Sequence, residues 1–171
     1  MAVLEREIDI ATADGAMNTF VTHPERDGPY PVVLFYMDAP GKREELHDMA
    51  RRLATVGYYV MLPNLYYRRV REFVMTADSR AQMMAHMNSL SNQMVCEDTS
   101  AMLQFAAGDL AAGDAGVGCV GYCMSGPFAF AAAAAFPDRI KAAASLHGIR
   151  LCTDAVDSPH LGADEIPGEL Y

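Results

Sequence analysis

The chain has 171 residues, of which 51% are hydrophobic and 20% charged, so it is long enough for one domain with a substantial core and too apolar for a disordered protein. Its net charge of −9 argues against nucleic acid and anionic membranes as partners, because both bind basic surfaces. The longest apolar run, residues 128–136, is far shorter than the ~18 residues that a membrane span needs.

The first half of the chain predicts a β-hairpin followed by a strand–helix–strand unit. Alternating segments at 3–10 and 17–24 flank Asp14-Gly15, a pair that favours a tight turn. The run VVLFY at 32–36 is continuously apolar, as in a strand buried on both faces. Helical spacing then predicts a helix over 42–57, and a second apolar strand follows at 58–63.

The second half continues the alternation of strands and helices. Residues 64–95 are polar and rich in methionine, and we expect a helix in their second half; Asp98 or Thr99 is expected to cap a further helix. A strand, an alanine-rich helix and another strand are then expected at 117–122, 125–136 and 142–148, before a loop at 149–168. Such alternation is typical of an α/β fold, and we expect a mostly parallel sheet with helices on both faces in a single domain, residues 1–171.

Cys123 occupies the predicted turn between the strand at 117–122 and the helix that follows. A nucleophile on such a turn stands above the carboxyl ends of the strands, and small residues two positions away on each side, here Gly121 and Ser125, prevent clashes. The helix N-terminus favours a thiolate. The backbone N–H of Met124 and that of Ala39, after the strand at 32–36, are the candidate oxyanion-hole donors.

Two other interpretations of this stretch are weaker. Cys123 could be a small buried residue in a glycine-rich turn, without a catalytic role. Cys119, within the preceding strand, is expected to be such a core residue. Residues 116–121 also satisfy G-x-G-x-x-G, but these glycines lie before and within the strand instead of in the loop that opens the helix. We therefore expect no dinucleotide and no other cofactor, and the His and Cys spacings predict no metal site.

The chain resembles the dienelactone hydrolases, a branch of the α/β-hydrolase fold with a cysteine nucleophile. The resemblance rests on VVLFYMDAPG, GYYVMLPNLYYR, VGCVGYCMSG and FPDRIKAAASLHG, which together cover most of residues 30–150. It implies hydrolysis of a small lactone or ester through a Cys-Asp-His triad with Cys123 as nucleophile. It also implies that Asp38, where the family often has glutamate, keeps the resting thiol inert, and that Ser125 replaces a frequent glycine.

The acid and the histidine of that triad have no matching position in the chain. His147 directly follows the apolar segment AAASL (142–146), on the same edge as Cys123, and is an accessory candidate; His160, near Asp154 and Asp157, is another. We therefore expect an α/β-hydrolase domain that is incomplete at its C-terminal end, with the later strands missing. The bare sheet edge would invite self-association or a partner chain.

An alternative follows from the missing triad residues, namely a non-catalytic family member that acts as a scaffold or binding module.

The four cysteines form no CxxC pair and the N-terminus lacks a basic stretch before an apolar run. These features are typical of reduced thiols and of a cytoplasmic protein.

Overall fold

A computed structural model describes residues 2–151, and its first element is the hairpin that the sequence predicts. Strand β1 (Val3–Thr12) pairs antiparallel with β2 (Gly15–Pro24), and Thr12 lies opposite Gly15. Gly15 has a φ of 131°, a conformation that glycine adopts without a steric penalty.

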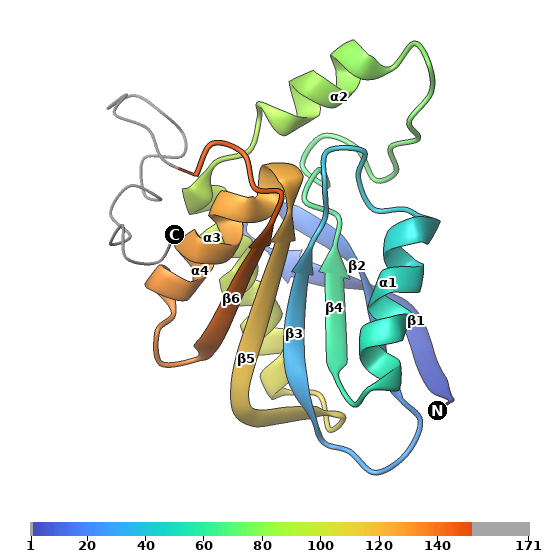
Figure 1. Cartoon of the computed structure of the whole chain (residues 1–171), viewed down its shortest axis with the longest axis vertical. Helices are drawn as coiled ribbons and strands as arrows, with labels where there is room; N and C mark the ends of the chain where they lie inside the picture. The colour runs from blue at the N-terminus through green and yellow to red at the C-terminus, as the bar shows by residue number, and fades with distance from the viewer. Residues whose placement is uncertain (1, 152–171) are drawn as a thin grey trace.

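Four further strands extend this hairpin into one sheet. They are β3 (Tyr30–Tyr36), β4 (Tyr59–Pro63), β5 (Ala112–Tyr122) and β6 (Ile140–Leu146). Within the described residues the order is β1-β2-β4-β3-β5-β6. The pairs β4–β3, β3–β5 and β5–β6 are parallel, whereas β2–β4 is antiparallel. The mostly parallel sheet is thus confirmed, and the carboxyl ends of β3, β4, β5 and β6 meet at one edge (Figure 1).

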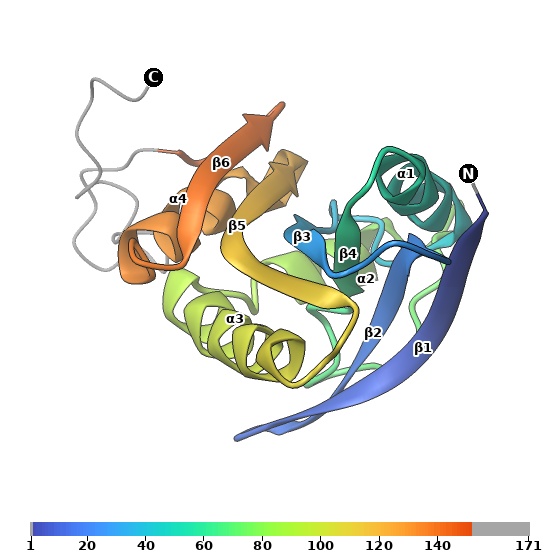
Figure 2. The ribbon, with the colours of Figure 1, turned by 90° about the horizontal axis from the view of Figure 1, so that it is seen from below.

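Helices cover both faces of the sheet, as predicted. Helix α1 (Glu44–Thr55) lies on one face, and α3 (Asn92–Ala107) and α4 (Gly126–Ala135) lie on the other (Figure 2). The short helix α2 (Arg80–Met87) stands above the carboxyl ends of the strands (Figure 1). No helix in the described part of the chain is both long and apolar enough to cross a bilayer.

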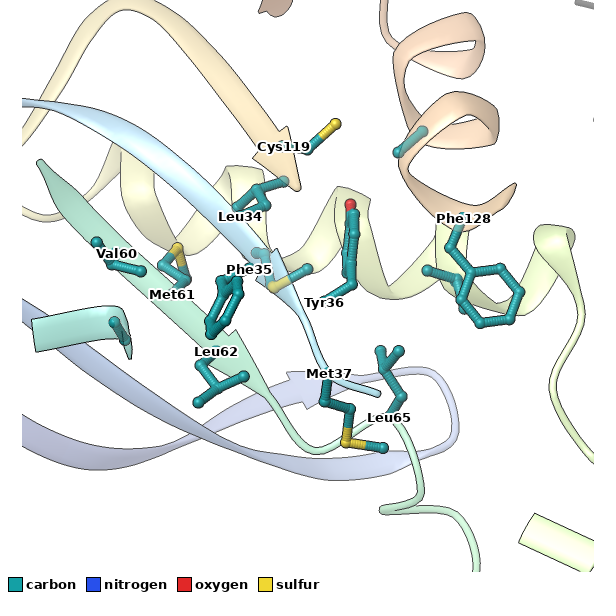
Figure 3. Close-up of a cluster of buried hydrophobic side chains, with 14 of the residues drawn as sticks. Leu34, Phe35, Tyr36, Met37, Val60, Met61, Leu62, Leu65, Cys119 and Phe128 are labelled. Atoms are coloured by element: carbon teal, nitrogen blue, oxygen red, sulfur yellow. The ribbon is translucent and has the colours of Figure 1, made fainter. Parts of the chain in front are cut away.

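The core surrounds β3 and β4: every residue of β4 is buried, and so is every residue of β3 except Pro31 and Val33. Leu34, Phe35 and Tyr36 have no exposed surface, as expected for a continuous apolar run in a central parallel strand. They pack with residues of β4 and with Phe128 of α4 (Figure 3). The ends of β3 and β5 therefore extend from a well-packed core.

One predicted helix start is wrong. Helix α3 begins at Asn92, after the N-cap Ser91, whose hydroxyl accepts a hydrogen bond from the Met94 N–H at 3.2 Å. Asp98 and Thr99, the predicted caps, lie inside the helix and are fully buried. Cap-forming residues occur there because their side chains bind other parts of the fold: Asp98 accepts from Tyr67 and Arg68, and the Thr99 hydroxyl contacts that of Tyr36.

Strand β6 ends the sheet at the side opposite the hairpin. Residues of β3, β5 and β6 line an apolar groove of about 560 Å³ on the sheet face next to it. The predicted bare edge is therefore present in the described residues, and its covering by a second copy or a partner chain stays a prediction. The loop expected at 149–168 lies outside the described residues from 152 onward.

Candidate active site

Cys123 lies at a sharp turn between β5 and α4, as the sequence predicts. It is the first residue of a short 3₁₀ segment, η1 (Cys123–Ser125), which leads directly into α4. Its φ is 53°, in the left-handed region that residues other than glycine seldom adopt. The residue is half-buried. The turn thus holds a partly accessible thiol in a strained backbone conformation at the carboxyl edge of the sheet.

The tightness of this turn explains the glycines on either side of Cys123. A Cβ atom at Gly121 would lie 2.0 Å from the backbone oxygen of Ser125, and one at Gly126 would lie 2.4 Å from Ser145 Oγ. Real Cβ contacts are never this short, so any side chain at 121 forces the backbone to move. Gly121 is therefore a condition for the turn itself.

The segment 37–39, which follows β3, is held against this turn by two hydroxyl groups. Ser125 Oγ donates to the Met37 carbonyl oxygen at 2.5 Å. Tyr66 Oη donates to the Ala39 carbonyl oxygen at 2.8 Å and also contacts Met124 Sδ at 3.3 Å. The structure therefore brings together Ala39 and Met124, the two residues whose amides the sequence singles out. No acceptor for the Ala39 N–H is found within residues 2–151.

Asp38, between Met37 and Ala39, binds an arginine. Arg43 donates to the two carboxylate oxygens of Asp38 at 2.5 and 3.0 Å, and its pKa is raised, chiefly by this hydrogen bond. The Asp38 side chain is 22% exposed. No hydrogen bond between Asp38 and Cys123 is found in the described part of the chain, so Arg43 is the partner that the structure gives to this carboxylate.

His147 follows β6 on the same edge as Cys123. Tyr122 and Leu146 pair across β5 and β6, so Cys123 and His147 are the next residues along two adjacent strands. The Ile149 N–H donates to the Cys123 carbonyl oxygen at 3.1 Å and ties the segment after β6 to the turn. His147 itself is exposed, and its φ is 56°.

The remaining histidines have other surroundings. His23, His47 and His86 stack on aromatic rings, namely those of Tyr59, Phe20 and Tyr66 respectively. The candidates His160, Asp154 and Asp157 lie outside the described residues. Among the described histidines, His147 is thus the one that strand register places beside Cys123.

Cys119 is a core residue, as predicted. It is 4% exposed, and its Sγ donates to the Ala129 carbonyl oxygen at 3.3 Å. Burial raises the pKa of this thiol to about 12, which keeps it protonated near neutral pH. The two cysteines, four residues apart, therefore differ in access and in environment.

Sequence reasoning missed two residues that contact the site. Tyr66 follows β4 and Arg43 precedes α1, and both reach the segment 37–39. A tyrosine three residues after the end of a parallel strand is a usable signal, because the ends of such strands meet at one edge. Met87 of α2 also reaches this region, where it lines a small hollow together with Met124, Phe128 and Ile149.

The glycine pattern at 116–121 lies within strand β5. Gly118 and Gly121 lie within β5, whereas a dinucleotide-binding loop would need its glycines between strand and helix. Within the described ranges, no three His, Cys, Asp or Glu side chains gather as metal ligands would.

The family model and the relatives that match the chain point to the same family. The model of the Dienelactone hydrolase family matches residues 17–170. A relative from Methylorubrum extorquens, named as a carboxymethylenebutenolidase, is 31% identical over 150 residues, which are 87% of this chain. Another from Synechocystis, named likewise, is 24% identical over 157 residues. The chain spans 50% of the first relative's length and 63% of the second's.

Solved structures share the fold. A structure from Klebsiella pneumoniae, named as a dienelactone hydrolase, superposes with a TM-score of 0.76 at 23% identity, over 93% of this chain and 65% of that one. A dienelactone hydrolase from Anabaena variabilis gives a TM-score of 0.64 at 16% identity, over 86% of this chain and 65% of that one. The observed α/β arrangement is thus that of the α/β-hydrolase fold, as predicted.

Proposed function

Because the chain belongs to the dienelactone hydrolase family, we propose that it carries the nucleophile and the oxyanion site for hydrolysis of a small lactone or ester. One observation supports this proposal above the others: Cys123 holds a φ of 53° at the turn between β5 and α4. Strained non-glycine backbone of this kind clusters at functional sites, and a strand–turn–helix nucleophile is characteristic of this fold.

The proposed reaction begins with attack of the Cys123 thiolate on the carbonyl carbon of the substrate. A C–S bond forms, and the carbonyl π electrons move onto oxygen. The N–H groups of Met124 and Ala39 donate to this oxyanion, and loss of one such donor costs roughly 10²–10³ in rate. The alkoxide or enolate then leaves with the electron pair of the C–O bond, and a thioester remains on Cys123.

Hydrolysis of the thioester needs a base that activates water. The resemblance implies an aspartate and a histidine for this step, and neither has an assigned position in the chain. His147 is the histidine that strand register places beside Cys123. We expect residues 1–171, which we propose to form one domain, to become acylated and to release the acyl group slowly. Loss of triad members typically leaves only ~10³–10⁴-fold catalysis over water.

Reaction with p-nitrophenyl acetate tests this proposal. The wild type is expected to release a burst of about one p-nitrophenolate per chain and to gain an acetyl group at Cys123 by mass spectrometry. Cys123→Ala should abolish the burst, whereas Cys96→Ala, which removes a half-buried cysteine on α3, should retain it. If His147 accepts the thiol proton, His147→Ala should be acylated more slowly than the wild type. An equal acylation rate would mean that His147 does not accept this proton.

The alternative of a non-catalytic binding module has its own outcome in this assay. Equal p-nitrophenolate release by the wild type and Cys123→Ala, with no acetyl group on Cys123, would refute the nucleophile and favour the alternative.

A further inference from the structure

Tyr66 connects the two residues whose amides form the proposed oxyanion site. It follows β4 and is 1% exposed. Its hydroxyl donates to the Ala39 carbonyl oxygen at 2.8 Å and lies 3.3 Å from Met124 Sδ. These contacts join chain segments 27 and 58 residues away from Tyr66. A single buried hydroxyl thus touches the oxyanion residue of the segment after β3 and that of the turn after β5.

The surroundings of Tyr66 hold it in one place. Asn64 Oδ1 accepts from the Tyr66 backbone N–H at 3.0 Å, while the Asn64 amide group donates to the carbonyl oxygens of Val70 and Arg71. The tyrosine ring stacks on His86, with centroids 5.1 Å apart, and meets Phe73 edge-on at 6.2 Å. Packing and backbone bonds therefore preorganise the hydroxyl.

The position of the Ala39 peptide depends on such anchors. Ala39 lies in a turn that the Gly41 N–H closes onto the Asp38 carbonyl oxygen at 3.0 Å, and the next residue, Pro40, has no N–H to add a further bond. Burial raises the pKa of Tyr66, and the nearby charges of Asp38 and Cys123 raise it further. The hydroxyl therefore keeps its proton and remains a donor over the whole pH range of an esterase assay.

We propose that Tyr66 is a positioning residue, which holds the Ala39 N–H at the distance from the Met124 N–H that a tetrahedral oxyanion requires. The proposal rests on the proposed function, since it concerns the same oxyanion site. Ser125 contributes through its bond to the Met37 carbonyl oxygen, two residues before Ala39. Catalytic geometry is sensitive to such supports, because a displacement of 1 Å can cost about 10² in rate.

Two reactions of the same thiol separate positioning from a general structural effect. Acylation by p-nitrophenyl acetate forms a C–S bond, passes through an oxyanion and expels p-nitrophenolate. Alkylation by iodoacetamide forms a C–S bond at an sp³ carbon and expels iodide, with no oxyanion. In both reactions the thiol proton ends in the buffer, whether or not His147 accepts it first. Mass spectrometry of the peptide that contains Cys123 measures each rate on the full chain.

Tyr66→Phe is expected to slow acylation of Cys123 about tenfold while changing its alkylation less than twofold. Tyr67→Phe is the matched control. It removes the neighbouring hydroxyl, which binds Asp98 and Thr12 away from the site, and should leave the ratio of the two rates unchanged. Ser125→Ala gives a second test should Tyr66→Phe fail to fold, and it should slow acylation selectively in the same way.

The outcomes distinguish the two proposals. Selective loss of acylation in Tyr66→Phe or Ser125→Ala supports the positioning role. An unchanged ratio of acylation to alkylation in folded Tyr66→Phe overturns it while leaving the nucleophile in place. A wild type that is alkylated at Cys123 but never acylated overturns the proposed function, and the positioning role with it.

Discussion

Replacement of Gly121 by alanine tests the structural basis of the turn at Cys123. The new Cβ would lie 2.0 Å from the Ser125 backbone oxygen, whereas ordinary contacts begin at 3.4 Å. The backbone must therefore move by about 1.4 Å, since neither atom belongs to a flexible side chain. A shift of that size also breaks the hydrogen bond from Ser125 Oγ to the Met37 carbonyl oxygen, which is 2.5 Å long.

The expected cost is about 3–4 kcal/mol in the free energy of unfolding. Overpacking contributes up to ~3 kcal/mol, and the lost buried hydrogen bond contributes ~1 kcal/mol. Urea denaturation followed by circular dichroism measures this change. Acylation of Cys123 by p-nitrophenyl acetate should fall with it, because the thiol and the Ala39 amide lose their relative positions.

Gly118→Ala is the matched control in the same strand. A Cβ at Gly118 would have its nearest neighbours at 3.9 and 4.0 Å, so this substitution should change stability by less than ~1 kcal/mol. If Gly121→Ala and Gly118→Ala have equal stability and equal acylation rates, the turn at Cys123 tolerates a side chain at 121, and close backbone contact is not what positions the thiol.

Three further predictions concern buried groups. With the Cys119 pKa raised to about 12 by burial, iodoacetamide at pH 8 should modify Cys123 but not Cys119 until urea unfolds the chain, as peptide mapping will show; equal modification contradicts this. Arg68→Met removes the cation of the buried Asp98 carboxylate, which keeps only the Tyr67 hydroxyl as a donor; this should cost about 3–5 kcal/mol in urea denaturation, and a cost below ~1 kcal/mol would refute the role of the ion pair. Burial lowers the pKa of His86, so the unfolded chain binds the proton first as pH falls. The free energy of unfolding should then fall below pH ~6.5 by up to ~1.4 kcal/mol per pH unit. His86→Gln should reduce this dependence on pH between pH 7.5 and 5.5, and an equal pH dependence in the wild type and the variant would contradict the prediction.

The sequence alone determined the local elements and the place of the thiol. Period-two alternation with Asp14-Gly15 predicted the hairpin, and the apolar run at 32–36 predicted a buried strand. Both patterns express local backbone preferences and burial, which a few consecutive residues encode. The turn at Cys123 was also predictable, because a strand pattern and a helix pattern meet there around Gly121.

Local patterns failed where a polar side chain has a distant partner. Asp98 and Thr99 have the chemistry of helix caps, yet they lie inside α3, since Tyr67, Arg68 and Tyr36 satisfy their oxygens. A residue's preference for a cap is worth about 1 kcal/mol, less than the cost of leaving the buried partners unpaired. Tertiary contacts therefore decided where this helix begins.

The support of the proposed oxyanion residues depends on contacts between distant parts of the chain. The order of β4, β3 and β5 places the ends of three separate chain segments at one edge of the sheet. There Tyr66 reaches Ala39 across 27 residues, and Ser125 reaches Met37 across 88. Hydrogen bonds over such separations depend on the packing of the whole sheet, because the two partners come close only when the chain folds. They therefore produce no periodic pattern in the sequence.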